Sequence, residues 1–84
     1  QLNNIGKVYS DLGDNQQALK FYNQSLSLKI ELRDKSGQAA TLNNIGTVYN
    51  DLGDKQQSLK FYNQSLSLSI EVGNKSQQAT TLNN

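Results

Sequence analysis

The residues in this sequence best suited to specific chemistry are asparagines. Asn4, Asn44 and Asn84 recur at intervals of forty residues, each as the last residue of an LNN segment. An asparagine amide has two N–H donors and a carbonyl acceptor, so one side chain can donate and accept hydrogen bonds at the same time. The pattern therefore offers uncharged hydrogen bonding rather than proton transfer or nucleophilic attack.

Catalytic and redox chemistry lack their usual residues. The chain has no cysteine and no histidine, which removes disulfides, thiolate metal ligands and the commonest general base. The aspartates Asp11, Asp14, Asp51 and Asp54 fall at predicted turns and outer helix faces, without a partner suited to catalysis. The LGD segment at 52–54 lacks the glycine and lysine of a phosphate-binding loop. We therefore expect no enzyme activity, no metal site and no cofactor.

Charge and hydropathy narrow the range of partners. The net charge is +1 and the lysines and arginines are scattered, so no basic surface for nucleic acid is expected. No apolar run approaches the roughly 18 residues of a membrane span, and no signal peptide is visible. The absence of cysteine favours a reducing compartment, the cytoplasm. A chain of 84 residues buries only about 60–65% of its unfolded surface, so its core should be thin.

The chain repeats itself with a period of forty residues. Of the first forty residues, 29 are identical to the residues forty positions later. We divide the single segment 1–84 into a partial first repeat at 1–34, a full repeat at 35–74 and the start of a third at 75–84. Solenoids of helical hairpins have periods of roughly 34–47 residues, which makes them the expected architecture.

The first half of each repeat is typical of an amphipathic helix. On a helix through 39–52, the apolar side chains fall within an arc of about 120°. Gly53 suits the left-handed position past a helix end, and Asp54 with Gln57 three residues on resembles a capping box. The predicted core stripe consists of Leu42, Ile45, Val48, Tyr49 and Leu52.

The second half of each repeat contains an ambiguous segment, SLSLSIEV at 65–72. Alone, its alternation is typical of a half-buried strand. On a helix through 55–72 the same residues form two ridges, each suited to a different neighbouring helix: Leu59, Tyr62, Leu66 and Ile70, and then Phe61, Leu68 and Val72. We therefore predict helices at 1–12, 15–32, 35–52, 55–72 and 75–84. The breaks LRDKS and VGNKS offer Asp34 or Ser36, and Asn74 or Ser76, as N-caps.

Aromatic residues and one glycine in each repeat fit a structural role. The tyrosines and phenylalanines recur at helical spacing, and we interpret them as core rather than as base-stacking platforms. Gly46 lies in the middle of a helix, where glycine costs about 1 kcal/mol relative to alanine. Close approach of a neighbouring helix would offset that cost.

The repeat resembles the tetratricopeptide repeat. The longer variants of about forty residues with an LNNIG helix, as in kinesin light chains and bacterial signalling arrays, are the most similar. The resemblance implies an all-α fold, a right-handed α-solenoid of antiparallel helix pairs, here two repeats plus the start of a third. The residues that match the pattern are Leu42, Ile45, Gly46, Tyr49, Gly53, Asp54, Leu59, Tyr62 and Leu66.

The resemblance also implies a binding face. In this family the first helices of successive repeats line a concave surface that binds extended peptides of partner proteins. A row of asparagines, one per repeat, could bond both the N–H and the C=O of a peptide backbone without reading its side chains. Duplication of a polar surface residue explains the row equally well, and Lys7 with Asp11 is typical of a solvated pair. The implied binding residues are Asn3, Asn4, Lys7, Asn43, Asn44, Thr47, Asn50, Asp51 and Asn84.

The ends of the chain suggest a second role, as a structural spacer that assembles with itself. Natural solenoids end in capping repeats with a polar outer face, and neither end of this sequence has one. We expect the ridge of helix 55–72 to be only partly covered, and the start of another copy offers Ile5, Tyr9 and Leu12 to cover it. Such stacking would be head-to-tail.

Overall fold

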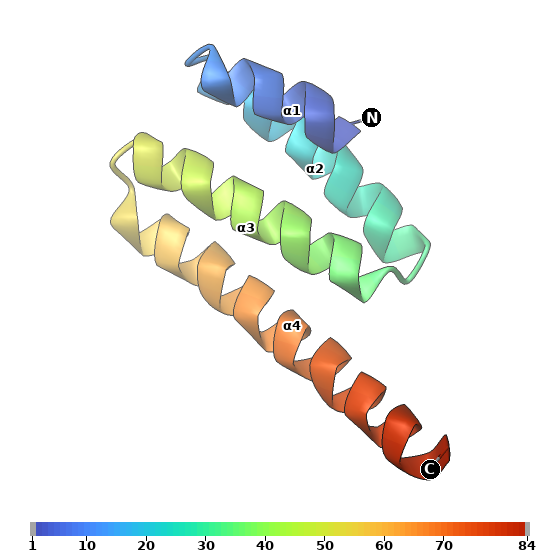
Figure 1. The fold of residues 1–84 in the computed structure, drawn as a ribbon. Helices are drawn as coiled ribbons and strands as arrows, with labels where there is room; N and C mark the ends of the chain where they lie inside the picture. Colours follow the sequence, from blue (N-terminus) through green and yellow to red (C-terminus); the bar gives the residue numbers. More distant parts are fainter. Residues whose placement is uncertain (1, 84) are drawn as a thin grey trace.

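The computed structural model describes the backbone of residues 2–83 and the side chains of residues 2–73. These residues form four α-helices without a strand, so the all-α prediction is confirmed, including for SLSLSIEV (Figure 1). The helices are α1 (Leu2–Asp11), α2 (Asn15–Glu31), α3 (Lys35–Asp51) and α4 (Lys55–Asn83). They form two antiparallel hairpins, α1–α2 and α3–α4, and α2 packs against α3 between them. No helix in this part of the chain is both long and apolar enough to cross a membrane.

The turn within each hairpin is made by a glycine followed by an aspartate. Gly53 has φ +84°, and the Asp54 N–H donates to the Tyr49 carbonyl at 2.9 Å, which satisfies the end of α3. The Asp54 carboxylate then accepts from the Gln57 N–H at 3.1 Å and caps α4. The residues forty positions earlier form the same turn, with φ +82° at Gly13.

The turn between the hairpins is made without glycine. Arg33 takes the left-handed position with φ 57°, which is unusual for a residue with a Cβ. Asp34 is the N-cap of α3: its carboxylate accepts from the Gly37 N–H at 2.9 Å and lies 3.6 Å from the Lys29 ammonium. Of the two caps considered from the sequence, Asp34 and Ser36, the structure has Asp34.

The predicted break at 72–76 is wrong, because α4 continues through Gly73 to Asn83 (Figure 1). Neither Asn74 nor Ser76 is therefore an N-cap. Ser69 and Asn74 occupy the positions that Lys29 and Asp34 have forty residues earlier. The sequence at 69–74 therefore cannot form the ion pair that supports the turn between α2 and α3. Each residue added to a helix gains a backbone hydrogen bond. A turn at Gly73 would lose several of these bonds without an ion pair to compensate, so α4 continues.

The two helices of each hairpin approach closely at a glycine, as expected for Gly46. A Cβ on Gly46 would lie 2.7 Å from the Tyr62 ring, and a Cβ on Gly6 would lie 2.7 Å from the Tyr22 ring. Ordinary van der Waals contact begins at about 3.4 Å. Each glycine therefore lets a tyrosine ring of the second helix approach the first helix closely.

The core lies where α2 meets α3 and is continued by the aromatic side chains. Ala18, Tyr22, Ile45 and Val48 form its buried centre. The rings of Tyr9 and Phe21 are stacked with centroids 5.6 Å apart, and those of Tyr49 and Phe61 with centroids 5.4 Å apart. The interpretation of the aromatic residues as core is confirmed, because they pack on one another inside each hairpin.

The predicted core stripe of α3 is correct except at its end. Leu42, Ile45 and Val48 are buried, and Tyr49 is partly buried against them. Leu52 is 51% exposed, because it is the C-cap residue of α3 and turns away with the chain. Leu66 on α4 is 59% exposed, as expected for a ridge that is only partly covered.

Candidate functional site

The candidate site is the outer surface of the first helices, α1 and α3, which we call the first-helix face. Its described residues are mostly exposed; Asn3 and Asn44 are half-buried. Asn84 lies outside the residues whose structure is described. The two helices are in contact with each other. The first-helix face consists of Asn3, Asn4 and Lys7 on α1 and Asn43, Asn44, Thr47, Asn50 and Asp51 on α3.

Asn4 and Asn44 have amides available for a ligand. Within the described residues 2–73, neither side-chain amide makes a hydrogen bond. Asn4 is exposed, and Asn44 is half-buried. The two residues occupy equivalent positions in the two hairpins, so their amides are presented by the same local structure. An incoming backbone could satisfy both donor and acceptor on each.

Asn3 is already engaged within the protein. Its amide donates to the Thr41 hydroxyl at 3.1 Å, and that hydroxyl lies 3.2 Å from the Asn3 carbonyl oxygen. Thr41 is fully buried, and the pair joins α1 to α3. Sequence reasoning missed this contact; the available signal was a threonine on the arc of α3 that faces α2, where apolar residues were expected.

Two further residues of the first-helix face are held by neighbours in the second hairpin. The Thr47 hydroxyl donates to the Asn43 carbonyl at 3.1 Å and lies 2.9 Å from the Tyr62 hydroxyl. The side-chain amide oxygen of Asn50, Oδ1, accepts from the Lys55 ammonium at 2.5 Å. These contacts fix the side chains at their positions without covering them, because both remain exposed.

Charge plays a small part at the first-helix face. The Lys7 ammonium lies 3.9 Å from the Asp11 carboxylate, and both side chains are about 70% exposed. A pair of this kind contributes a few tenths of a kcal/mol at most to stability.

Burial, and secondarily the Asp11 charge, raises the pKa of the Tyr22 phenol above its ordinary value. Among the described residues, no group of three or more acidic side chains could hold a metal ion.

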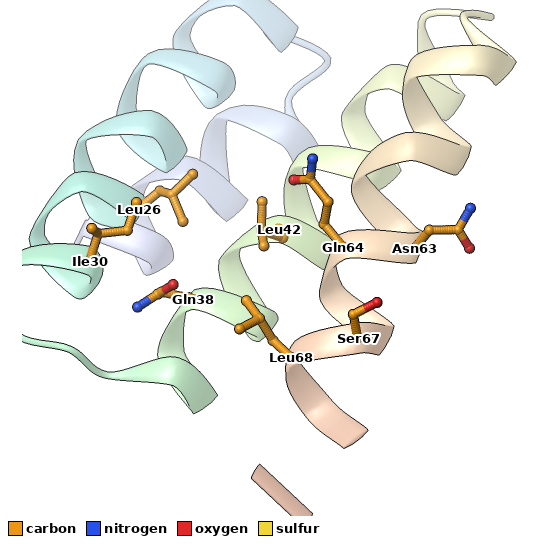
Figure 2. Close-up of a pocket in the computed structure, with 8 residues that line it drawn as sticks. All are labelled: Leu26, Ile30, Gln38, Leu42, Asn63, Gln64, Ser67 and Leu68. Carbon is orange, nitrogen blue, oxygen red and sulfur yellow. The ribbon is translucent and has the colours of Figure 1, made fainter. Parts of the chain in front are cut away.

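A separate groove runs between α2 and α4, with α3 at its base (Figure 2). It has a volume of about 500 Å³, and none of its lining residues is charged. Figure 2 shows Leu26, Leu42 and Leu68 around its centre, whereas Asn63 points away from it. This groove was not predicted, because it depends on α2 and α4 lying on opposite sides of α3 without touching. Its other lining residues are Ile30, Gln38, Gln64 and Ser67.

Comparison with known families identifies this arrangement. The family model of the tetratricopeptide repeat matches residues 2–71, from the start of α1 almost to Val72 of α4. The chain belongs to the tetratricopeptide repeat family. No curated protein and no solved structure matches it significantly. Tetratricopeptide repeats are non-catalytic helical hairpins that mediate protein–protein interactions. The finer likeness to kinesin light chains stays a prediction.

Proposed function

We propose that this tetratricopeptide repeat segment binds an extended peptide of a partner protein on its first-helix face. The observation that carries the proposal is the pair of available amides, Asn4 and Asn44, at equivalent positions on α1 and α3. An extended backbone needs donors and acceptors in alternation, and each amide supplies both. Recognition of this kind tolerates many peptide sequences, because the contacts are with the main chain.

The other residues of the first-helix face have supporting roles in this proposal. Asn43, Thr47, Asn50 and Asp51 border Asn44 with polar groups, and Lys7 and Asp11 do the same on α1. Asn84 is the third residue of the asparagine row in the sequence. Asn3 contributes by joining α1 to α3 through Thr41, which sets the positions of the two available amides relative to each other.

The proposal is tested with a peptide that the chain itself selects. A screen of a random peptide library against the 84-residue chain supplies a binder, whose affinity is then measured for wild type and for Asn44→Ala. We expect the variant to bind more weakly by about 1–3 kcal/mol, roughly 5- to 150-fold, because a peptide backbone group loses its partner. Asn63→Ala is the matched control, since it removes an exposed amide that lies on α4. Equal affinity of wild type and Asn44→Ala would refute the proposal.

A structural role is the second candidate function, in which copies of the segment join end to end as a spacer. The observation that favours it is the exposure of apolar residues on the first and the last helix, 57% for Val8 on α1 and 59% for Leu66 on α4. Neither residue belongs to the first-helix face. The two functions are therefore compatible in one chain.

A further inference from the structure

The two hairpins provide an internal comparison of helix surfaces. Each residue of the first hairpin has a counterpart forty positions later in the same local structure, so a difference in exposure reports what packs on the hairpin from outside. Ile5 is 41% exposed, whereas its counterpart Ile45 is 1% exposed. Val8 is 57% exposed, whereas Val48 is fully buried. The difference arises because α2 covers α3, whereas no helix among the described residues covers the same side of α1.

The second helices also differ in exposure, but here the helix of the second hairpin, α4, is the more exposed one. Leu59 and Leu66 on α4 are 61% and 59% exposed. Their counterparts on α2, Leu19 and Leu26, are partly buried and pack against the core. The α2 side of this contact is therefore complementary to the α3 side, and the same chain carries an uncovered copy of each. We call Ile5 and Val8 the α1 surface, and Leu59 and Leu66 the α4 surface.

We propose that the α1 surface of one copy of this chain docks on the α4 surface of a second copy, in the register in which α3 packs on α2. This inference rests on the structural role proposed above and specifies its partner and interface. The complementarity is already realised inside the molecule with the same residue types. None of these four residues is charged.

The continuation of α4 leaves the docking position open. Gly73 is the counterpart of Arg33, which lies in the turn before α3 begins. The described residues of α1, Leu2–Asp11, correspond to Leu42–Asp51 of α3. A copy docked in this register therefore lies along α4 before Gly73. The two contact surfaces differ, so the contact is heterologous and leaves one surface of each kind free for a further copy.

The test measures mass by sedimentation velocity for the 84-residue chain over a roughly hundredfold concentration range. We expect the average mass to rise with concentration above the 9.3 kDa of one chain. Val8→Glu and Leu66→Glu should each remain monomeric, because each places a carboxylate in the apolar contact. Ile30→Glu is the matched control, since Ile30 is 56% exposed on α2 and belongs to neither surface. It should assemble like wild type. A wild-type chain that stays monomeric throughout would overturn the proposal.

Mixing the two variants tests the direction of the contact. Val8→Glu keeps the α4 surface and Leu66→Glu keeps the α1 surface, so an equimolar mixture should form a dimer of twice the chain mass and nothing larger. Self-association of either variant alone would overturn the head-to-tail arrangement, because it would show like surfaces pairing. Circular dichroism checks that both variants fold, and Ile5→Glu and Leu59→Glu replace a variant that does not. Peptide binding by the monomeric variants tests the first-helix face separately.

Discussion

Replacement by alanine should have opposite effects on the stability of the fold at two helical glycines, Gly46 and Gly73, because only Gly46 is in close contact with a neighbouring helix. Adding a Cβ at Gly46 places it 2.7 Å from the Tyr62 ring and 3.2 Å from the Ser58 carbonyl oxygen. The ring must recede by about 0.7 Å to reach the 3.4 Å of ordinary contact. It cannot do so freely, because the Tyr62 hydroxyl lies 2.9 Å from the hydroxyl of Thr47. Nothing lies within 4 Å of a Cβ at Gly73.

The magnitudes follow from two competing terms. Overpacking of a filled contact costs about 1–3 kcal/mol, and replacing glycine by alanine inside a helix gains about 1 kcal/mol. Gly46→Ala should therefore destabilise the fold by up to about 2 kcal/mol, and Gly46→Val by about 1–3 kcal/mol because valine gains less from helix propensity. Gly73→Ala has only the favourable term and should stabilise by up to about 1 kcal/mol.

Urea denaturation followed by circular dichroism measures both changes. For a domain of this size, 1 kcal/mol also corresponds to a shift of about 4–8 °C in melting temperature. Gly6→Ala repeats the experiment in the first hairpin, where a Cβ would meet Tyr22 at 2.7 Å. Stabilisation by Gly46→Ala would refute the packing argument. Destabilisation by Gly73→Ala would show that α4 turns at Gly73 in solution, as the sequence first suggested.

Two further predictions concern a helix cap and a buried phenol. Asp34→Ala should destabilise the fold by about 0.5–2 kcal/mol in chemical denaturation, because the Gly37 N–H loses its acceptor at the start of α3; an unchanged midpoint would show that the cap contributes nothing. The pKa of Tyr22 is raised in the folded state, so the folded protein holds that proton more tightly than the unfolded chain does. The resulting stability is fully present below pH 10.0, the unfolded value, and is lost as the pH rises through the folded pKa. Denaturation midpoints above pH 10.0 should therefore fall less steeply for Tyr22→Phe than for wild type, and equal slopes would contradict this assignment.

The sequence predicted the helices well where a local signal and a packing partner agreed. Gly13 and Gly53 are each followed by a capping aspartate, and both turns formed as expected. Gly73 gives a similar local signal, with Asn74 in place of the aspartate, but α4 continues through it. The turn at Arg33 shows why, because it forms without glycine where a cap and an ion pair support it.

The candidate site could be predicted in composition but not in its contacts. The outer arc of α3 follows from helical periodicity, so Asn43, Asn44 and Thr47 were expected to share a side. The contact of Asn3 with Thr41 depends on how one hairpin sits on the next, which periodicity within a single helix does not determine. For the same reason the groove between α2 and α4 appears only in the folded molecule.

Side-chain amide resonances test the central claim most directly. When ¹⁵N-labelled protein is titrated with a selected peptide, the largest shifts should occur at the side-chain amides of Asn4 and Asn44, with smaller changes at Asn43. Gln38 and Gln64, which line the groove between α2 and α4, should not move. Saturable shifts at Gln38 and Gln64, with Asn4 and Asn44 unchanged, would contradict peptide binding on the first-helix face, because the peptide would then occupy the groove.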